Sequence, residues 1–137
     1  MNYLIDTNII SELIKAKPNV LVVQKLASIL STSLYLSVLT WGELRKGIEK
    51  LGPSKKKEQL KSWLEKDLPN WFDGRILPIN KEVTDRWGRL LAEINRSVPA
   101  IDSLIAATAL HYDAAVITRN QKDFDYPGLI VINPFES

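Results

Sequence analysis

Cysteine is absent from this chain of 137 residues, and histidine occurs once, at His111. Without cysteine the protein has no disulfide, no thiolate zinc site and no cysteine nucleophile. No apolar run approaches the ~18 residues of a membrane-spanning helix. The basic segment of a signal peptide is also missing, because the first apolar run ends at Asp6. The sequence therefore predicts a cytoplasmic protein without a membrane anchor.

A large excess of charge of one sign is missing too. Lys and Arg total 18 against 16 Asp and Glu, which gives a net charge of +2. This balance neither requires nor excludes a polyanionic partner, so any nucleic-acid surface has to be local. Hydrophobic residues make up 45% of the chain and charged residues 25%, as in ordinary globular proteins. With no repeat or linker, residues 1–137 are expected to form one domain.

Segments typical of β-strands alternate with segments typical of helices. The expected strands are residues 3–5, 34–40, 75–79, 114–118 and 129–133. The expected helices run from residue 6 to 15–17, around 22–30, from 40 to 51, through 60–68, through 83–94 and from 99 to 112. Because parallel strands need crossover connections, this order predicts an α/β fold in three layers, α/β/α, around a central, mainly parallel sheet of about five strands.

Four acidic residues follow strands or open helices of this expected fold. Asp6 ends the first strand, and Glu43 falls within one turn of the expected start of its helix. Asp102 lies in the first turn of the helix that starts near residue 99, and Asp123 follows the strand at 114–118. In an open α/β sheet the functional crevice lies beyond the carboxyl ends of the strands. The four carboxylates are therefore predicted to meet at one edge of the sheet.

Each acid also has an ordinary structural explanation. Asp6 could cap a helix, and Thr40 with Glu43 has the spacing of a capping box. Asp102 could complement a helix dipole, and Asp123 could be a solvated loop residue. One acid at a time, the structural explanation is the better one, and only the joint occurrence of all four favours a site.

Carboxylates gathered within a few ångströms repel one another, so such a cluster takes up protons or a cation. Oxygen ligands without His or Cys suit Mg²⁺ or Mn²⁺ rather than zinc. Such an ion can polarise a phosphate and activate a water, which favours phosphodiester hydrolysis. Thr7, Thr118 and Asn120 sit beside the acids and could orient water or phosphate. His111 lies late in a helix, where packing or a favourable helix dipole is the more ordinary role.

Basic residues are frequent between residues 45 and 61, with Trp41 and Trp63 among them. Such a stretch could follow an RNA backbone and stack bases. The lysines could equally occupy the wet face of an amphipathic helix, and the spacing of Trp63 with Leu60 and Leu64 favours a packing stripe. The candidate RNA-binding residues are Arg45, Lys46, Lys50, Arg119 and Lys122.

Four segments, "LIDTNIISEL", "LSVLTWGELRKGI", "AIDSLIAATAL" and "VITRNQKDF", resemble in order and spacing the motifs of PIN-domain ribonucleases. They are most similar to VapC/FitB-like toxins of type II toxin–antitoxin systems, and the resemblance spans essentially the whole chain. It implies a single PIN domain and Mg²⁺- or Mn²⁺-dependent endonucleolytic cleavage of RNA. The family's catalytic and metal-binding acids fall on Asp6, Glu43, Asp102 and Asp123, and its accompanying polar residues fall on Thr7 and Asn120.

The same resemblance implies protein partners. A VapC-like toxin is held inactive by a small cognate antitoxin and forms a homodimer through apolar helix faces. Candidate faces are the helices around residues 22–30 and 60–68. The connection "INRSVPAID" is shorter than in many relatives, so the substrate rim there does not carry over, and neither does the identity of the antitoxin.

Other functions remain open to a fold of this class. A phospho-receiver domain needs a phosphorylatable Asp at the end of a central strand, but the third strand here ends "ILPIN" without an acid. A dinucleotide-binding module would need a glycine-rich loop after the first strand, and none follows. An RNA-binding module of the same fold without nuclease activity is a further alternative, against which the complete set of four acids argues.

Overall fold

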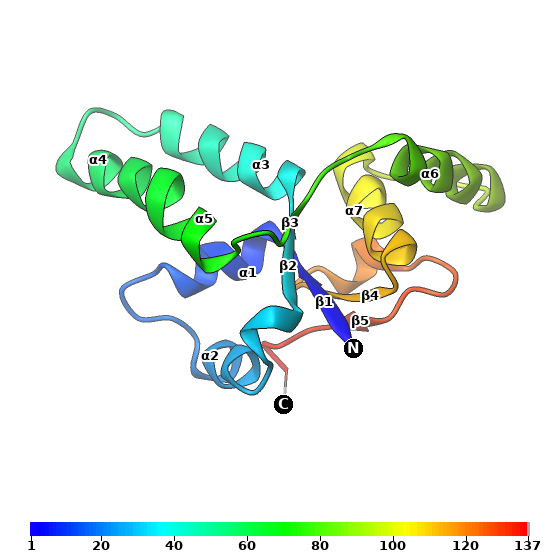
Figure 1. Cartoon of the computed structure of the whole chain (residues 1–137), viewed down its shortest axis with the longest axis horizontal. Helices are drawn as coiled ribbons and strands as arrows, with labels where there is room; N and C mark the ends of the chain where they lie inside the picture. The colour runs from blue at the N-terminus through cyan, green and yellow to red at the C-terminus, as the bar shows by residue number, and fades with distance from the viewer. Residues whose placement is uncertain (137) are drawn as a thin grey trace.

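The computed structural model describes residues 1–136 and has a five-stranded, all-parallel sheet at its centre (Figure 1). The strands are β1 (Asn2–Ile5), β2 (Leu34–Ser37), β3 (Ile76–Leu77), β4 (Ala114–Ile117) and β5 (Val131–Ile132). Their order across the sheet is β3-β2-β1-β4-β5, so the chain begins in the middle strand. Tyr3 of β1 pairs with Leu34 on one side and with Ala115 on the other. The predicted α/β class and parallel sheet are confirmed.

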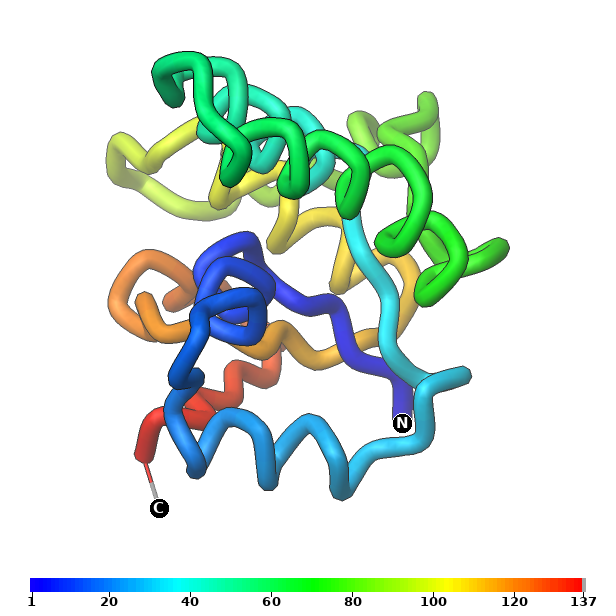
Figure 2. The backbone as a smooth tube through the Cα atoms, turned by 90° about the vertical axis from the view of Figure 1, so that its left-hand side faces the viewer, coloured from blue at the N-terminus to red at the C-terminus, as the bar shows by residue number. Residues whose placement is uncertain are grey.

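Helices cover both faces of the sheet and complete the three predicted layers. The first five, α1 to α5, lie on one side, and α6 and α7 lie on the other (Figures 1 and 2). Their bounds are α1 (Thr7–Leu13), α2 (Val20–Ala27), α3 (Val38–Glu49), α4 (Lys55–Ser62), α5 (Leu68–Trp71), α6 (Lys81–Glu93) and α7 (Ala100–His111). A π-helical turn, Trp63–Asp67, joins α4 to α5, and 3₁₀ turns form at Ser31–Ser33 and Gln121–Phe124. No helix within residues 1–136 is both long and apolar enough to cross a bilayer.

Alternate residues of the central strands supply two separate cores. Ile5 and Leu36 face the α1–α5 side, whereas Leu4 and Val116 face the α6–α7 side, and all four are almost completely buried. Side chains of a strand alternate between the faces of the sheet. Strands buried on both faces therefore read as continuous apolar runs, which explains why they stand out in the sequence.

The apolar stripe of residues 60–68 belongs to the core of this chain. Leu64 and Leu68 are fully buried, and Leu60 and Trp63 pack partly exposed against the same cluster. The packing interpretation of Trp63 is therefore the better one. The expectation that this stripe offers a free face for dimerisation is wrong for its buried members. They already pack against the sheet and against helices α1 to α3 of the same chain.

Helix α2 retains an apolar outer side. Val22 and Leu26 pack into the core, but Val20 is 66% exposed and Val23 is 40% exposed. Of the two helix faces expected to dock a partner, the one around residues 22–30 thus keeps exposed apolar surface.

Helix α3 begins earlier than the sequence predicts. Ser37 ends β2 and caps the helix, and its hydroxyl accepts a hydrogen bond from the N–H of Leu39 at 3.0 Å. Thr40 lies inside the helix and is fully buried, which rules out the capping box of Thr40 and Glu43 that stood as the structural alternative for Glu43. Both Ser and Thr cap helices well, and the residues between them are typical of strands, which is why the sequence placed the start too late.

Two smaller differences from the expected elements concern the end of α1 and the length of β3. Helix α1 ends at Leu13, before the residues 15–17 expected from the sequence. The third strand, β3, is an edge strand of 2 residues. The middle position, where a receiver domain would need its acid, belongs to β1, and Asp6 follows it directly.

Candidate active site

Asp6 is held where β1 becomes α1, and it is 5% exposed. One carboxylate oxygen, Oδ1, accepts the N–H of Thr7 at 2.8 Å. The other, Oδ2, accepts the hydroxyl of Thr118 at 2.8 Å and the amide of Asn8 at 3.2 Å. The pKa of Asp6 is raised overall, chiefly by burial and also by the charge of Glu43. The hydrogen bonds from Thr118, Thr7 and Asn8 partly offset this rise. Asp6 therefore caps α1 and also lies within electrostatic range of another candidate acid, so the two interpretations of this residue are compatible.

Asn8 is a site residue that the sequence analysis missed. Its Nδ2 donates to Asp6 and, at 3.3 Å, to the hydroxyl of Thr118. Its Oδ1 accepts the backbone N–H of Arg119 at 3.1 Å. Asn8 thereby ties the start of α1 to the end of β4. Three consecutive polar residues after a buried strand, Asp-Thr-Asn, were the available signal.

Thr118 lies at the end of β4 and is fully buried. Its hydroxyl donates to Asp6 and accepts the backbone N–H of Asn120 at 3.0 Å. Thr118 thus holds the Asp6 carboxylate in place. Asn120 contributes this N–H and the carbonyl that accepts the N–H of Asp123 at 3.0 Å, which places the turn carrying Asp123.

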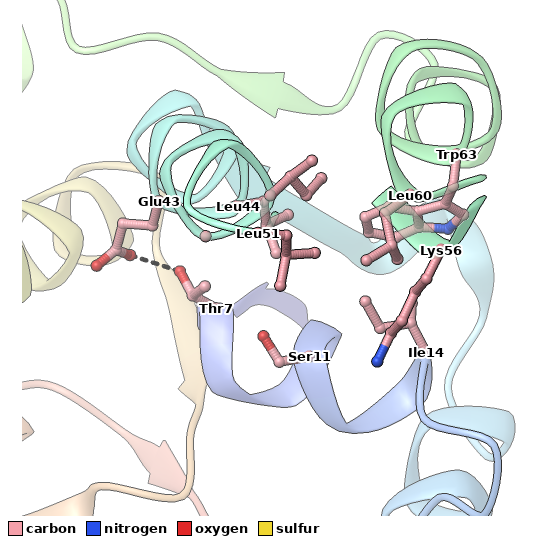
Figure 3. A pocket seen from close by; sticks show the side chains of 11 residues that line it. Thr7, Ser11, Ile14, Glu43, Leu44, Leu51, Lys56, Leu60 and Trp63 are labelled. Atoms are coloured by element: carbon pink, nitrogen blue, oxygen red, sulfur yellow. Dashed lines mark hydrogen bonds between the residues drawn. The ribbon is translucent and has the colours of Figure 1, made fainter. Parts of the chain in front are cut away.

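Glu43 projects from α3 toward α1 (Figure 3). The hydroxyl of Thr7 donates to Glu43 Oε1 at 2.5 Å and also lies 3.2 Å from the hydroxyl of Thr40. Thr7 therefore links α1 to α3 beside Asp6. Its predicted place among the acids agrees with this geometry.

Asp102 and Asp123 complete the acidic edge from the α7 side. Asp102 lies in the first turn of α7, and Asp123 lies in the 3₁₀ turn after β4. Burial, followed by the charges of Asp6, Asp123 and Glu43, raises the pKa of Asp102 to about 6. The carboxyl of Asp102 is thus within electrostatic range of the other three acids chosen from the sequence, although the four come from different elements.

The acids do not converge on a single point. Within residues 1–136, no three acidic or histidine side chains are close enough to hold one ion together. Mg²⁺ usually keeps several waters and takes only one or two carboxylates directly. An all-oxygen set of mutually repelling acids, spread over a small edge, fits such a water-rich cation better than zinc.

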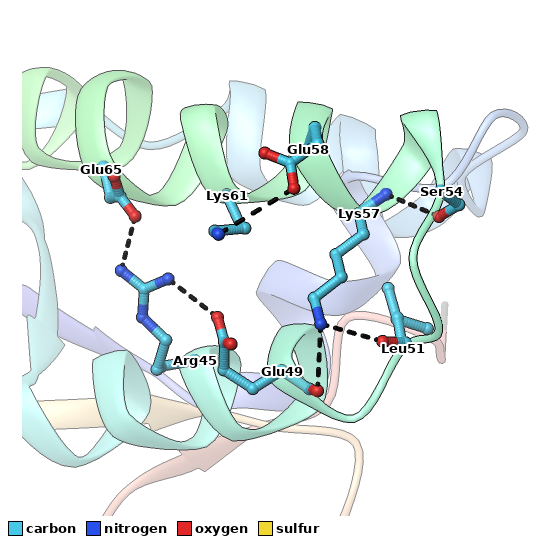
Figure 4. Close-up of polar contacts among 8 residues, drawn as sticks. All are labelled: Arg45, Glu49, Leu51, Ser54, Lys57, Glu58, Lys61 and Glu65. Carbon is cyan, nitrogen blue, oxygen red and sulfur yellow. Dashed lines mark hydrogen bonds and ion pairs between the residues drawn. The ribbon is translucent and has the colours of Figure 1, made fainter.

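The candidate RNA-binding residues have different surroundings. Arg45 is occupied by two acids, Glu49 at 3.3 Å and Glu65 at 2.8 Å, which join α3 to the turn after α4 (Figure 4). Lys46 is exposed on α3, Lys50 is exposed directly after its last residue, and both line a hollow of about 580 Å³ together with Glu43. Among the described residues neither lysine forms an ion pair.

Two further candidates lie beyond β4. The guanidinium of Arg119 stacks over the ring of Phe135 at 4.5 Å. Lys122 is exposed in the turn that carries Asp123. Lys122 therefore has a free position near the acids, whereas Arg119 is partly held by the C-terminal segment.

A second hollow, of about 250 Å³, adjoins the Thr7–Glu43 contact between α1, α3 and α4 (Figure 3). Its lining is mostly apolar and includes Leu44, Leu60 and Trp63. Lys56 reaches across its mouth from α4 toward Ile14 (Figure 3). The acidic edge is thus bordered by an apolar groove.

Comparison with known proteins gives consistent matches over the whole chain. The family model "PIN domain" matches residues 3–128. Plasmid stability protein StbB of Pseudomonas syringae pv. tomato is 37% identical, with 98% of this chain and 99% of that protein covered. Toxin FitB of Neisseria gonorrhoeae is 36% identical (96% and 97% covered), and VapC ribonuclease Y4jK of Sinorhizobium fredii is 35% identical (96% and 96% covered).

Solved structures share the fold closely. FitAcB from Neisseria gonorrhoeae superposes with a TM-score of 0.92 at 36% identity, covering 98% of this chain and 99% of that chain. A toxin–antitoxin complex from Klebsiella pneumoniae has a TM-score of 0.69 at 27% identity, covering 99% and 100%.

Proposed function

The chain belongs to the PIN-domain family, and on that basis we propose that it is a metal-dependent endoribonuclease that acts as the toxin of a toxin–antitoxin pair. The observation that carries this proposal is the gathering of acids from different elements around Asp102, whose pKa is raised by burial and then by the charges of Asp6, Asp123 and Glu43. The relatives named toxin FitB and VapC ribonuclease Y4jK support the reaction and the role. The family match over residues 3–128 supports a single PIN domain across residues 1–137.

Among Asp6, Glu43, Asp102 and Asp123, one or two carboxylates would contact the cation directly, and the others would hold it through its bound waters. A bound Mg²⁺ or Mn²⁺ would neutralise the acids, polarise the scissile phosphate and supply a water of lowered pKa. Within the protein, Thr118 and Asn8 hold the Asp6 carboxylate in place, and Thr7 orients Glu43.

The RNA would approach over α3. Lys46 and Lys50 stand in the same hollow as Glu43, so they would neutralise backbone phosphates on either side of the bond that is cut. Since such contacts are to the backbone, they position the RNA without reading its sequence. Both RNA and a cognate antitoxin are expected in the cytoplasm, and we place the activity there.

Cleavage of RNA tests the enzymatic part of the proposal. Purified protein is incubated with a panel of structured RNAs in Mg²⁺, in Mn²⁺ and in EDTA. We expect internal cuts that require the metal and are at least ~100-fold slower in Asp6→Asn, because even residues that only support a metal ligand are worth about 10- to 100-fold. Asp73→Asn, an exposed acid remote from the edge, is the matched control and should behave as wild type. Cleavage that persists in EDTA and in Asp6→Asn would refute the proposal.

Growth tests the toxin role separately. We propose a small antitoxin encoded beside this protein, and a homodimer that uses the exposed side of α2 around Val20 and Val23. Expression of the protein alone should arrest growth, and co-expression of the neighbouring small reading frame should relieve the arrest. A nuclease that is active in vitro but harmless when expressed would contradict the toxin role and leave the ribonuclease in place.

A further inference from the structure

Tyr126 is the buried side chain whose polar atom the fold leaves without a partner. It is 5% exposed and packs in the α6–α7 core with Phe124, Ile94 and Ile105. Its backbone is fixed by hydrogen bonds to Phe124 and from Leu129. Within residues 1–136, its hydroxyl is the one buried side-chain nitrogen or oxygen that makes no hydrogen bond.

A buried phenol without a partner is unusual. Most buried polar side-chain atoms are hydrogen-bonded, because leaving one unpaired forfeits its bonds to water. Phe would fill the same space without that cost. The hydroxyl of Tyr126 therefore calls for a partner outside the protein's own donors and acceptors.

The surroundings of the hydroxyl indicate where that partner lies. Burial and then the charge of Asp102 raise the pKa of Tyr126, Arg96 lowers it, and Asp123 raises it. The phenol is thus within electrostatic range of two acids of the candidate site, yet no direct hydrogen bond joins it to either. A polar pair too far apart for a direct bond can be bridged by one water. Since the hydroxyl oxygen is buried, an RNA phosphate cannot reach it, and an enclosed water bonded to buried polar groups is the partner that remains.

Arg96 fixes the ring in this position. Its guanidinium lies 5.6 Å from the centre of the Tyr126 ring and donates to the carbonyl of Asp125. Arg96 belongs to the short connection between α6 and α7 that leads to Asp102. The connection before one acid and the segment after another are thus joined at this tyrosine.

We propose that Tyr126 is a positioning residue of the acid site, whose hydroxyl donates a hydrogen bond to a water bound by Asp102 and so holds that carboxylate toward a divalent cation. The inference rests on the proposed metal-dependent function. It explains why a tyrosine occupies a position where phenylalanine would pack equally well. Outer partners of metal ligands typically change metal affinity or activity by about 10- to 100-fold.

The test compares Tyr126→Phe with Tyr35→Phe, which removes a phenol hydroxyl from β2. Binding of Mn²⁺ alone is measured by calorimetry and by the rise of the melting temperature, without RNA. We expect the half-saturating Mn²⁺ concentration of Tyr126→Phe to rise about 10-fold or more, and that of Tyr35→Phe to stay at the wild-type value. The metal-free melting temperature of Tyr126→Phe should be equal to that of wild type or higher, because an unpaired buried group is removed.

Kinetics give a second readout. In RNA cleavage at fixed Mn²⁺, Tyr126→Phe should lower kcat about 10-fold or more and leave KM for the RNA within about twofold. Arg96→Met, which frees the ring, should shift the Mn²⁺ response in the same direction by a smaller factor. A folded Tyr126→Phe protein with wild-type Mn²⁺ affinity would overturn the inference.

The two proposals fail in different ways. A wild-type protein that binds Mn²⁺ but cuts no RNA would refute the ribonuclease, while the Mn²⁺ affinities of Tyr126→Phe and Tyr35→Phe would still decide the role of Tyr126. If the wild-type protein cuts RNA and the Tyr126→Phe variant binds Mn²⁺ with the same affinity as wild type, only the role of Tyr126 is refuted.

Discussion

Asp6 and Asp102 are both acids of one edge, but the fold treats them differently. Asp6 ends a central strand, is almost fully buried, and accepts hydrogen bonds from Thr7, Asn8 and Thr118. Asp102 opens a helix, is only half-buried, and receives no hydrogen bond among the described residues. The position of the Asp6 carboxylate is therefore fixed by the protein itself. The position of the Asp102 carboxylate is not fixed by any hydrogen bond within residues 1–136.

This contrast has a physical basis. A strand end is fixed by the sheet on both sides, so neighbouring loops can supply donors at set positions; here β4 provides Thr118 through the pairing of Ile5 with Ile117. In the first turn of α7, by contrast, Asp102 is given no side-chain or backbone donor in the part of the chain that the structure describes, so its oxygens remain available to a ligand. A carboxylate that is already held in place by hydrogen bonds loses little freedom when it binds a ligand, whereas an unsupported one must be ordered at that moment.

The largest expected effect comes from removing the unsupported acid. A cation that binds only the folded state stabilises it by ~2.7 kcal/mol at 100 times its dissociation constant, several degrees of Tm for a domain of this size. We expect Mn²⁺ to raise Tm of wild type in this way. Asp102→Asn should have a higher metal-free Tm, because repulsion among the acids is relieved, and a much weaker response to Mn²⁺. An Asp102→Asn protein that responds as strongly as wild type and Asp73→Asn would remove Asp102 from the site.

Breaking the hydrogen-bond network around Asp6 should lower the stability of the folded protein. Thr118→Val removes the hydroxyl that donates to Asp6 and accepts from Asn8 and Asn120. Leaving buried groups unpaired costs about 1–3 kcal/mol, so Tm measured by calorimetry should fall by several degrees. Thr118→Ser keeps the hydroxyl and should lose much less.

Thr108 provides the control for this prediction. It is also fully buried, but its hydroxyl donates only to the carbonyl of Leu104 in its own helix, at 2.7 Å. Thr108→Val should therefore cost less than Thr118→Val. Equal losses in the two variants would mean that the network around Asp6 adds nothing to stability.

The same contrast marks what the sequence could predict. The four acids were predictable, because each follows a strand or opens a helix and the alternation of strands and helices brings such positions to one edge. Asn8 was not, since its partners Thr118 and Arg119 are more than 100 residues away in the chain. The ion pair between Arg45 and Glu65 was not predictable either, because it joins two different helical segments that are 20 residues apart in the chain.

Local competition explains the remaining misplacements. Ser37 and Thr40 are both good helix caps, and the start of α3 depends on where β2 ends. In the structure β2 ends at Ser37, so Ser37 is the cap. The stripe at Leu64 and Leu68 was recognised correctly as apolar, but a helical period alone does not say whether the apolar side meets the protein's own core or another chain. Burial in the folded structure decides that question.

The pH dependence of stability tests the raised pKa of Asp102 without any ligand. The pKa of Asp102 is about 6 in the folded protein, above its ordinary value of 3.8, so the folded state binds the proton more tightly. The stability that this proton provides is present at low pH and is lost as pH rises from about 4 to 6. In EDTA, the Tm advantage of Asp102→Asn over wild type should therefore grow between pH 4 and pH 7. Because the group is partly exposed and screened, we expect a difference of about 1 kcal/mol or less. A gap that is constant with pH would contradict the raised pKa.

The smallest effect concerns RNA binding along α3, where paired and unpaired cations stand side by side. Arg45 is held by Glu49 and Glu65 (Figure 4), whereas Lys46 and Lys50 face the hollow beside Glu43. Each cation that neutralises a phosphate of single-stranded RNA contributes ~0.7 to the slope of log affinity against log salt. In an Asp6→Asn background that does not cut, Lys46→Ala and Lys50→Ala should each reduce the slope by about that amount. Arg45→Ala should change it less, because its charge is already balanced by two acids of this chain. Filter binding or fluorescence anisotropy between about 50 and 200 mM salt measures the slopes. A loss for Arg45→Ala as large as that for the lysines would show that its ion pairs open to admit the RNA.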